Sequence, residues 1–505
     1  MSRTIWITGD QCTKRNPALL DGKPGEDVVL MIESVARGNL KKYHKQKLVL
    51  IYSVMRHFAE ELRQEGWNVD YYQEHPDFKS AVKEHIEKCS PSALLIMEQS
   101  EYGMTERLTK LFPGIKSKVY SHCNFISNPD EFEKLHSTPE SRVTMESFYH
   151  VMRKKTGILM NGGKPEGGAW NYDKENRKPP TKGLQFPEPL LFPADQITKD
   201  VIQMVEKHFS DHPGTLDKWN YAVTRSDALK AADRFFENCL DSFGPYQDAM
   251  LSGVPFAFHS VLSPYINVCL LHPLELAKRA EAAYHSGNAS LSSVEGFVRQ
   301  LIGWREYIWR VYWRLMPEYK ERNALRADIP LPEFFWTGKT KMHCVSQALE
   351  CARDYGYGHH ILRLMVLGNF ALLAGLSPLE TNEWFSVMYV DGYDWVMVPN
   401  VIGMALHADN GYVGTKPYAA SANYINKMSD YCAKCPYSHK EATTDDACPF
   451  NTLYWDFLDR NYAVFSKNHR MQMMLRNLEN RPPEFMKEVR KRSKEIKQKM
   501  QEGSL

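Results

Sequence analysis

Short apolar runs alternate with amphipathic stretches over roughly the first 120 residues of the chain. Short apolar runs predict strands, and apolar residues at three- and four-residue spacing predict helices, here over residues 54–65 and 78–88. Such alternation predicts a mainly parallel sheet with helices on both of its faces. The predicted strands are residues 4–8, 28–32, 48–52, 69–72, 93–97 and 118–120.

The polar residues Gly9-Asp10-Gln11 follow the first predicted strand. Ligands of parallel sheets bind at the carboxyl ends of strands, so this turn is a candidate binding element. No G-x-G-x-x-G follows it, so the standard dinucleotide-binding fingerprint is absent.

The pattern changes after this region. Residues 161–195 are rich in glycine, proline and charge and predict a linker with little regular structure. From about residue 197 the spacing is helical, most clearly over residues 294–312 and 359–376. The sequence therefore predicts an α/β N-terminal domain over 1–130, a linker over 131–200 and an all-α domain over 201–505. The tail 485–500 carries seven lysines or arginines and predicts a helix with a solvated face.

Composition limits the class of protein. With 43% hydrophobic residues the chain can build large cores, which excludes wholesale disorder, and a net charge of +2 excludes a histone-like polycation. The 11 Trp, 26 Tyr and 23 Phe fit either large cores or an aromatic-lined site for a cofactor or a base. The start has no signal-peptide core, and the apolar stretch 364–376 is too short to cross a bilayer. We expect a soluble cytoplasmic protein with reduced or metal-bound cysteines.

Three cysteines have metal-ligand spacing. Cys432 and Cys435 form a C-x-x-C pair, and Cys448 follows after twelve residues. This spacing suits zinc or an iron–sulfur cluster, and either use needs a fourth ligand. The candidates for the fourth ligand are Cys344, Cys351, His439 or another histidine.

Four further blocks share one resemblance. They are HSVLSPYI at 259–266, VEGFVRQLIGWREY at 294–307, GHHILRLM at 358–365 and VDGYDWVMVPN at 390–400. Together with the cysteine set they resemble the iron–sulfur bacterial group of the cryptochrome/photolyase family, whose characterised repair members are prokaryotic (6-4) photolyases. The resemblance spans essentially the whole chain. It implies a Rossmann-like antenna domain at the N-terminus and an all-α C-terminal domain that binds FAD.

The resemblance implies two cofactors in the helical domain. One is a [4Fe-4S] cluster held by Cys344, Cys432, Cys435 and Cys448, with Cys351 left as a packing residue. The other is FAD, whose pyrophosphate would lie against hydroxyl and backbone N–H groups near a helix start. The implied FAD contacts are Ser260, Leu262, Ser263, Gln300, Arg305, His359, Asp391, Asp394 and Asn400, with Asn400 facing flavin N5.

The resemblance also implies how electrons reach the flavin. Trp384 matches the proximal donor and Trp336 the donor nearer the surface. The position between them is Phe385, a poor redox relay compared with tyrosine or tryptophan. Tyr389, Tyr393 and Trp395 are alternative donors.

The implied reaction is light-driven repair. An electron passes to a lesion flipped out of UV-damaged DNA, and a nearby general acid supplies a proton. His360 matches this acid, while Leu364 stands where animal (6-4) photolyases carry a second histidine. The implied lesion contacts are Gln247, Asp248, Tyr418 and Tyr424.

An antenna and a metal ion complete the implied set. The group binds 6,7-dimethyl-8-ribityllumazine against Gly9-Asp10-Gln11, Glu33 and the segment of Ile51, but Arg37 and Leu40 depart from its pattern. Asp173 resembles a position proposed for Mg²⁺, although a turn residue is the favoured interpretation there.

Two classes of function remain open at this point. One is a (6-4) photolyase, an enzyme that we expect to act as a monomer on damaged DNA without a membrane partner. The other is a signalling cryptochrome that binds FAD and the cluster but repairs nothing. His360, Asp248, Tyr418 and Tyr424 favour repair, and a cyclobutane-dimer photolyase is a third alternative.

Overall fold

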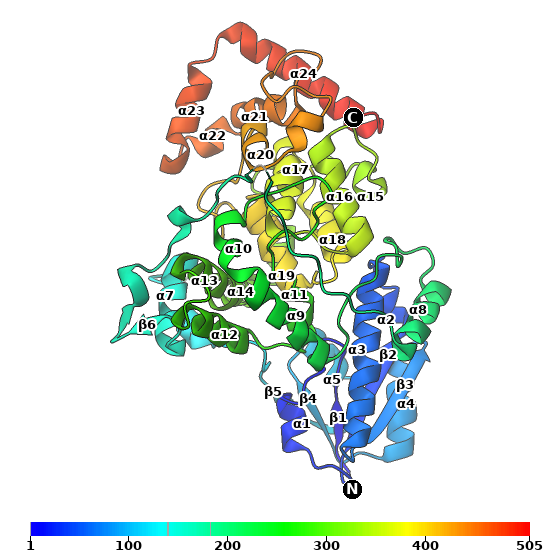
Figure 1. Ribbon diagram of the computed structural model, residues 1–505. Helices are drawn as coiled ribbons and strands as arrows, with labels where there is room; N and C mark the ends of the chain where they lie inside the picture. The colour runs from blue at the N-terminus through cyan, green and yellow to red at the C-terminus, as the bar shows by residue number, and fades with distance from the viewer. Residues whose placement is uncertain (1, 139–140, 182) are drawn as a thin grey trace.

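A five-stranded parallel sheet forms the N-terminal part of the computed structural model, which describes residues 2–138, 141–181 and 183–505 (Figure 1). The strands lie in the order β3-β2-β1-β4-β5, so the first strand is central and the chain winds outward on both sides of it. The strands are β1 (Thr4–Trp6), β2 (Val28–Ser34), β3 (Asn68–His75), β4 (Ala93–Met97) and β5 (Lys116–Tyr120).

Both faces of this sheet are buried. Ile5 and Val29 pack with residues of helix α3 (Lys45–Gln64), whereas Trp6 and Leu30 belong to a second core formed with α4 (Phe78–Cys89) and α5 (Met104–Thr109). Neighbouring residues of one strand point to opposite faces, which explains why these strands are apolar almost throughout. The predicted parallel α/β arrangement is confirmed.

One predicted strand is wrong. Residues 48–52 lie inside α3, a helix of 20 residues that packs against the sheet and against α8 (Gln196–His208). A short apolar run has no periodicity of its own, and a helix buried on two sides is apolar over most of its circumference. The run therefore belongs to the helix predicted at 54–65, which begins nine residues earlier than the pattern indicated.

The rest of the chain is mainly helical. Residues 161–195 contain two short 3₁₀ turns and the end of a two-stranded hairpin, as their composition predicts. The tail is helical, as predicted. The remaining elements are α1 (Pro17–Asp21), α2 (Val35–Gly38), α6 (Pro129–Glu133), α7 (Met145–Thr156), β6 (Met160–Asn161), β7 (Lys164–Pro165), α9 (Arg225–Asn238), α10 (Leu240–Tyr246), α11 (Ser263–Asn267), α12 (Pro273–His285), α13 (Leu291–Val298), α14 (Arg305–Leu315), α15 (Phe334–Thr337), α16 (His343–Tyr355), α17 (Asn369–Ala374), α18 (Pro378–Met388), α19 (Asp394–Val398), α20 (Ala422–Met428), α21 (Pro449–Arg460), α22 (Tyr462–Phe465), α23 (Gln472–Glu479) and α24 (Pro483–Gln501).

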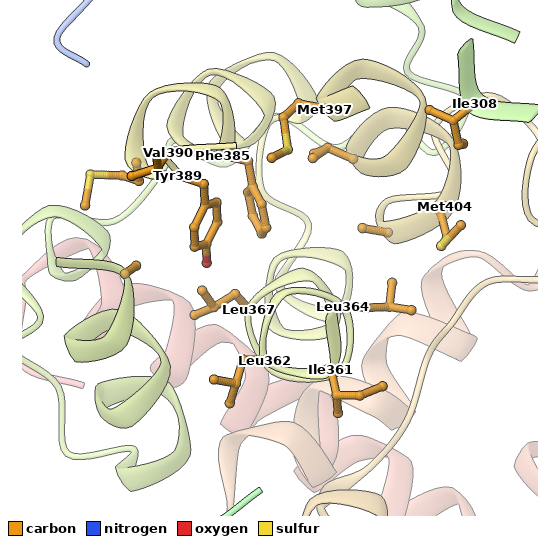
Figure 2. Packing of buried hydrophobic residues seen from close by; sticks show 14 of the residues in the cluster. Ile308, Ile361, Leu362, Leu364, Leu367, Phe385, Tyr389, Val390, Met397 and Met404 are labelled. Atoms are coloured by element: carbon orange, nitrogen blue, oxygen red, sulfur yellow. The ribbon is translucent and has the colours of Figure 1, made fainter. Parts of the chain in front are cut away.

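Three π-helical segments interrupt these helices, at Arg299–Trp304, Leu362–Gly368 and Pro399–Ala405. The second and third contact each other, and the second packs its apolar side chains toward α18, where Phe385 and Tyr389 point at it (Figure 2). A π-helical turn is rare and is found mostly at functional sites. All three segments fall within or beside the sequence blocks that carry the resemblance.

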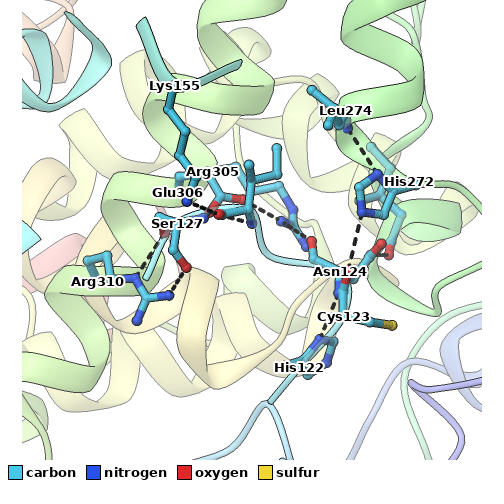
Figure 3. Close-up of polar contacts among 12 residues, drawn as sticks. His122, Cys123, Asn124, Ser127, Lys155, His272, Leu274, Arg305, Glu306 and Arg310 are labelled. Carbon is cyan, nitrogen blue, oxygen red and sulfur yellow. Dashed lines mark hydrogen bonds and ion pairs between the residues drawn. The ribbon is translucent and has the colours of Figure 1, made fainter. Parts of the chain in front are cut away.

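The sheet and the helices are joined through the segment that follows β5 (Figure 3). Glu306 of α14 is fully buried and accepts hydrogen bonds from the backbone N–H groups of Ile126 and Ser127, at 3.0 and 2.8 Å. Asn124 donates its side-chain amide to the carbonyl of Ile266, at 2.6 Å. Because a buried carboxylate needs such donors, this junction depends on its complete set of hydrogen bonds. Within the described residues, no helix has the length and apolar character needed to cross a membrane.

Candidate functional site

His360 begins the helix that contains the second π-helical segment. Solvent reaches its side chain, yet the surrounding protein removes enough water to lower the pKa of His360 to about 4, and the charges of Arg363 and Arg177 lower it further. The imidazole is therefore exposed on one side and packed against protein on the other. A titratable side chain with a displaced pKa beside charged neighbours is a candidate functional residue.

The residues predicted to contact the lesion converge beside it. The Tyr424 hydroxyl donates to Oδ2 of Asp248 at 2.9 Å, and burial raises the pKa of that carboxyl group. Arg177 is near enough to influence the titration of Asp248, Tyr418, Tyr424 and His360. Sequence reasoning missed Arg177, because a lone arginine in a polar linker carries no pattern.

Two more histidines pack behind this group. The rings of His259 and His359 are stacked with centroids 4.4 Å apart and planes inclined by 9°. Burial lowers the pKa of His259 to about 4 and that of His359 well below its ordinary value, so both rings are neutral at pH 7. His259 also makes a hydrogen bond of 3.0 Å to the backbone carbonyl of Gln247, which ties the predicted lesion contact to the predicted cofactor loop.

Asp391 is the centre of a second polar group. It accepts a hydrogen bond from the Ser263 hydroxyl at 2.6 Å and is paired with Arg363, whose NH1 and NH2 lie 2.9 and 3.2 Å from its oxygens. The Arg363 guanidinium also lies 3.9 Å from the centre of the Tyr389 ring. Arg363 was not among the predicted site residues, although it stands three positions after His360 in a block that was recognised.

A lysine of α3, on the sheet side, reaches the segment that carries Asp391. Lys47 of α3 is buried, and its Nζ donates to the carbonyl groups of Ser386, at 3.1 Å, and Gly392. Burial lowers the pKa of Lys47 to about 7. This residue was also missed, because a lone lysine just before the predicted strand 48–52 carries no pattern.

The remaining predicted flavin contacts have hydrogen-bond partners of their own. Arg305 donates to the Asn124 carbonyl at 2.8 Å and stacks 4.0 Å from the Phe125 ring, and Asp394 is paired with Lys320. The amides of Gln300 and Asn400 bond to carbonyls of their own helices, at 3.3 and 2.7 Å. The Ser260 hydroxyl oxygen lies 3.4 Å from the backbone nitrogen of Leu262, which is buried.

Several buried polar atoms in this region have no hydrogen-bond partner among the described residues. They include Nδ1 of His359, the hydroxyl groups of Tyr389 and Tyr393, and Nε of Arg305. Native proteins rarely leave such atoms unpaired, so each marks a position where a water molecule or a bound group completes the hydrogen bonding. Donors and acceptors of this kind fit a polar cofactor such as FAD.

The four predicted cysteine ligands lie together. The other three thiols act on Cys344 and, with burial, raise the pKa of its thiol, while Cys351 has Arg363, Asp354 and Glu350 as charged neighbours. Cys344 lies in the first turn of α16, and Cys448 caps the N-terminus of α21. The partial positive charge of a helix N-terminus stabilises thiolates. None of the four forms a disulfide, and the set fits a four-thiolate cluster.

The two predicted electron donors are connected through the backbone. Trp384 is fully buried, and its indole N–H donates to the carbonyl of Phe335 at 2.9 Å. Trp336 is the next residue in the chain and is 42% exposed. The Phe385 ring lies 5.2 Å from the Trp384 ring, so an aromatic side chain without redox function occupies the adjoining position.

The predicted antenna residues meet at the ends of β1 and β4. Asp10 accepts hydrogen bonds from Thr8 and Ser100, at 2.9 and 2.5 Å, and a Cβ atom on Gly9 would stand 2.5 Å from Ile51, so α3 packs directly on this turn. Glu33 lies elsewhere. It is 1% exposed, and its carboxylate accepts hydrogen bonds from Arg56, Tyr71 and the Glu74 backbone. These bonds leave Glu33 no acceptor for a ribityl chain.

Comparisons with known proteins agree with this geometry. Residues 5–221 match the family model described as deoxyribodipyrimidine photo-lyase-related protein. A protein named (6-4) photolyase from Agrobacterium fabrum is 45% identical over 478 residues, which cover 93% of this chain and 94% of that protein. The fold matches a bacterial class III photolyase from Agrobacterium tumefaciens with a TM-score of 0.59 at 15% identity, covering 92% and 98% of the two chains. It also matches a Synechocystis cryptochrome, with a TM-score of 0.56 at 12% identity over 85% and 88%.

Proposed function

The chain belongs to the cryptochrome/photolyase family, and from this premise we propose that it is a (6-4) photolyase that repairs pyrimidine–pyrimidone photoproducts of UV-damaged DNA in light. The observation that carries the proposal is that Arg177 lies near His360, Tyr418 and Tyr424, while Tyr424 is hydrogen-bonded to Asp248. A protein that only signals has no need of an acid, paired lesion contacts and a cation at one place. The domain assignment is an antenna domain over 1–130, a linker over 131–200 and a catalytic domain over 201–505.

FAD is the cofactor of this activity, and when reduced and excited by light it supplies the electron that breaks the lesion. Asp391 accepts hydrogen bonds in this site, and Arg363 balances its charge. Lys47 fixes the loop that carries Asp391. Ser260, Leu262 and Ser263 hold the pyrophosphate, and the other contacts are Gln300, Arg305, His359, Asp394 and Asn400.

His360 is the residue that donates the proton once lesion DNA is bound. Its pKa of about 4 keeps the imidazole neutral at pH 7 before DNA binds. A DNA phosphate beside Arg177 offsets the positive charges that act on His360, and this raises its pKa toward the range in which an acid is effective. Tyr424 and Asp248 position the lesion, and Gln247 and Tyr418 contact it. Leu364 offers no second acid.

Cys344, Cys432, Cys435 and Cys448 hold a [4Fe-4S] cluster, in which metal binding is coupled to folding. Trp384 and Trp336 deliver electrons to oxidised FAD through the Phe335 backbone. Replacing Trp384 with Phe is expected to slow photoreduction of the bound flavin without releasing it. An unchanged rate would instead assign the donor role to Tyr389, Tyr393 or Trp395.

The residues do not suit the two other groups that the resemblance implies, a lumazine antenna and Mg²⁺. The Glu33 carboxylate already accepts hydrogen bonds from Arg56 and Tyr71, so it does not suit a ribityl chain and no step of the reaction is assigned to a lumazine antenna. The Asp173 carboxylate is paired with Arg177 and Arg299, at 2.6 and 3.2 Å, which leaves no role for Mg²⁺. Asp173 instead helps to hold Arg177 in place.

The deciding experiment is repair by the purified protein under blue light. Defined duplexes carrying one (6-4) photoproduct or one cyclobutane dimer are incubated in light and in darkness, and restored pyrimidines are quantified. Light-dependent repair of the (6-4) lesion alone is the expected result. Repair of the cyclobutane dimer alone would make the protein a different photolyase, and flavin binding without repair of either lesion would make it a cryptochrome.

A further inference from the structure

A groove that the reaction does not use opens beside the lesion contacts. Its volume is about 700 Å³, and it is formed by α20, α21, α23 and the turn that leads into α24. These four helices come together at one end of the molecule, at the top of Figure 1. Tyr424 lines this groove and also bonds to Asp248, so the groove adjoins the predicted lesion site.

An aromatic ring and an arginine form one wall of the groove. The Arg481 guanidinium lies 4.3 Å from the centre of the Trp455 ring, and the Phe485 ring supports Trp455 edge-on at 5.9 Å. Among the described residues no carboxylate is paired with Arg481. The wall therefore presents a flat surface with an uncompensated positive charge.

Amide groups complete the lining. Asn423, Asn477 and Asn480 are exposed, and their side chains make no hydrogen bond to the described parts of the chain. None of the described residues that line the groove is acidic. Arginine and asparagine recognise the edges of bases, and aromatic rings stack on their faces. The groove thus combines base stacking, base-edge recognition and attraction for an anion.

We propose that this groove binds an unpaired nucleobase of the damaged duplex, namely a base opposite the lesion. The inference rests on the proposed function, because flipping the lesion out of the helix leaves the opposite bases without partners. The groove shares Tyr424 with the lesion site, so a base displaced from the same duplex position lies within its reach. Stacking on Trp455 and Arg481 then offsets part of the cost of opening the duplex.

The test uses (6-4) duplexes with the fluorescent base 2-aminopurine placed either opposite the lesion or beside it in the damaged strand. Binding is expected to quench only the opposite base. Trp455→Ala and Arg481→Ala are expected to abolish this quenching and to weaken binding of the lesion duplex by roughly 5- to 150-fold, the range for loss of one stacked base. Binding of the same lesion in single-stranded DNA is expected to stay within a few-fold of wild type.

Matched controls separate stacking from charge and from misfolding. Arg476→Ala removes one exposed positive charge from α23, outside the groove lining, and is expected to leave the quenching intact. Trp455→Phe keeps an aromatic ring and is expected to retain most of the affinity for the lesion duplex. Loss of single-strand binding as well would show that a variant is misfolded. If Trp455→Ala is misfolded in this sense, the result for Arg481→Ala decides whether the groove binds the base. Quenching of the base beside the lesion, or wild-type duplex affinity in both alanine variants, would overturn the proposal. A wild-type protein that does not prefer lesion DNA would overturn the proposed function instead.

Discussion

The sheet region and the helical region both bury polar groups, but they differ in the geometry of their helices. In the sheet region Glu33 is surrounded by donors from Arg56, Tyr71 and Glu74, and Asp10 is held by two hydroxyl groups. In the helical region His359, Tyr389 and Tyr393 carry buried polar atoms without partners, and three helices contain π-helical turns. Unpaired buried atoms also occur in the sheet region, on Gln11, Arg15, Asn16, Gln46, Ser53 and His57. What distinguishes the helical region is its π-helical turns, which are found mostly at functional sites.

The largest expected effect follows from removing a cluster ligand. Cys344→Ala takes one thiolate from the proposed cluster site, where a metal would hold α16, α21 and the turn before α21 together, so we expect loss of iron and insoluble protein. Cys351→Ala, on the same helix, is the matched control and is expected to retain about four irons per chain. Iron content and solubility are measured for both variants. Stoichiometric zinc in the wild type, or iron lost only from Cys351→Ala, would contradict the assignment.

The next effect concerns the acid. His360→Ala is expected to keep FAD and to bind lesion DNA within a few-fold of wild type, yet to lose repair by about 10²–10⁴-fold, the usual contribution of general acid catalysis. His359→Ala is expected instead to disturb the flavin, since His359 stacks on His259 and keeps an unpaired Nδ1. Repair rate, flavin absorbance and DNA affinity are measured separately. Near-normal repair by His360→Ala would place the acid elsewhere.

The same contrast explains what the sequence could predict. Short apolar runs located the strands, because both faces of the sheet are buried, and helical spacing located several of the helices. The pattern failed at residues 48–52, where a helix is buried on two sides. In the site, spacing alone left Cys344 and Cys351 open, and the resemblance favoured Cys344, whose thiol lies with the other three. Arg177 and Lys47 were missed because their partners lie far along the chain, 71 residues from Arg177 to Asp248 and 345 from Lys47 to Gly392, and no local pattern encodes such contacts.

A third prediction tests whether Glu33 in the sheet region contributes to stability rather than directly to repair. Glu33→Gln leaves the Arg56 charge buried without its partner, so we expect a loss of about 3 kcal/mol in the free energy of unfolding. Glu101→Gln, which breaks the more exposed pair with Arg37, is the control and is expected to cost less than about 1 kcal/mol. Denaturant unfolding gives both values. Both variants are expected to repair (6-4) lesions normally, and loss of repair in Glu33→Gln at unchanged stability would return Glu33 to a direct role.

The smallest effect is a pH dependence at the junction between the two regions. His122 packs against the rings of Phe125 and Trp309, and burial together with Arg305 lowers its pKa from 6.5 to about 3. Between these values the unfolded chain binds a proton that the folded chain does not, so stability falls as the pH is lowered through this window. The slope for one such histidine is about 1.4 kcal/mol per pH unit.

His122→Asn tests this dependence, because it keeps an acceptor for the Asn124 N–H and removes the titrating group. Between pH 6 and pH 4, the difference in unfolding free energy between variant and wild type is expected to change with this slope. Parallel stability curves for the two proteins would show that His122 is protonated in the fold, and that solvent enters the junction between sheet and helices.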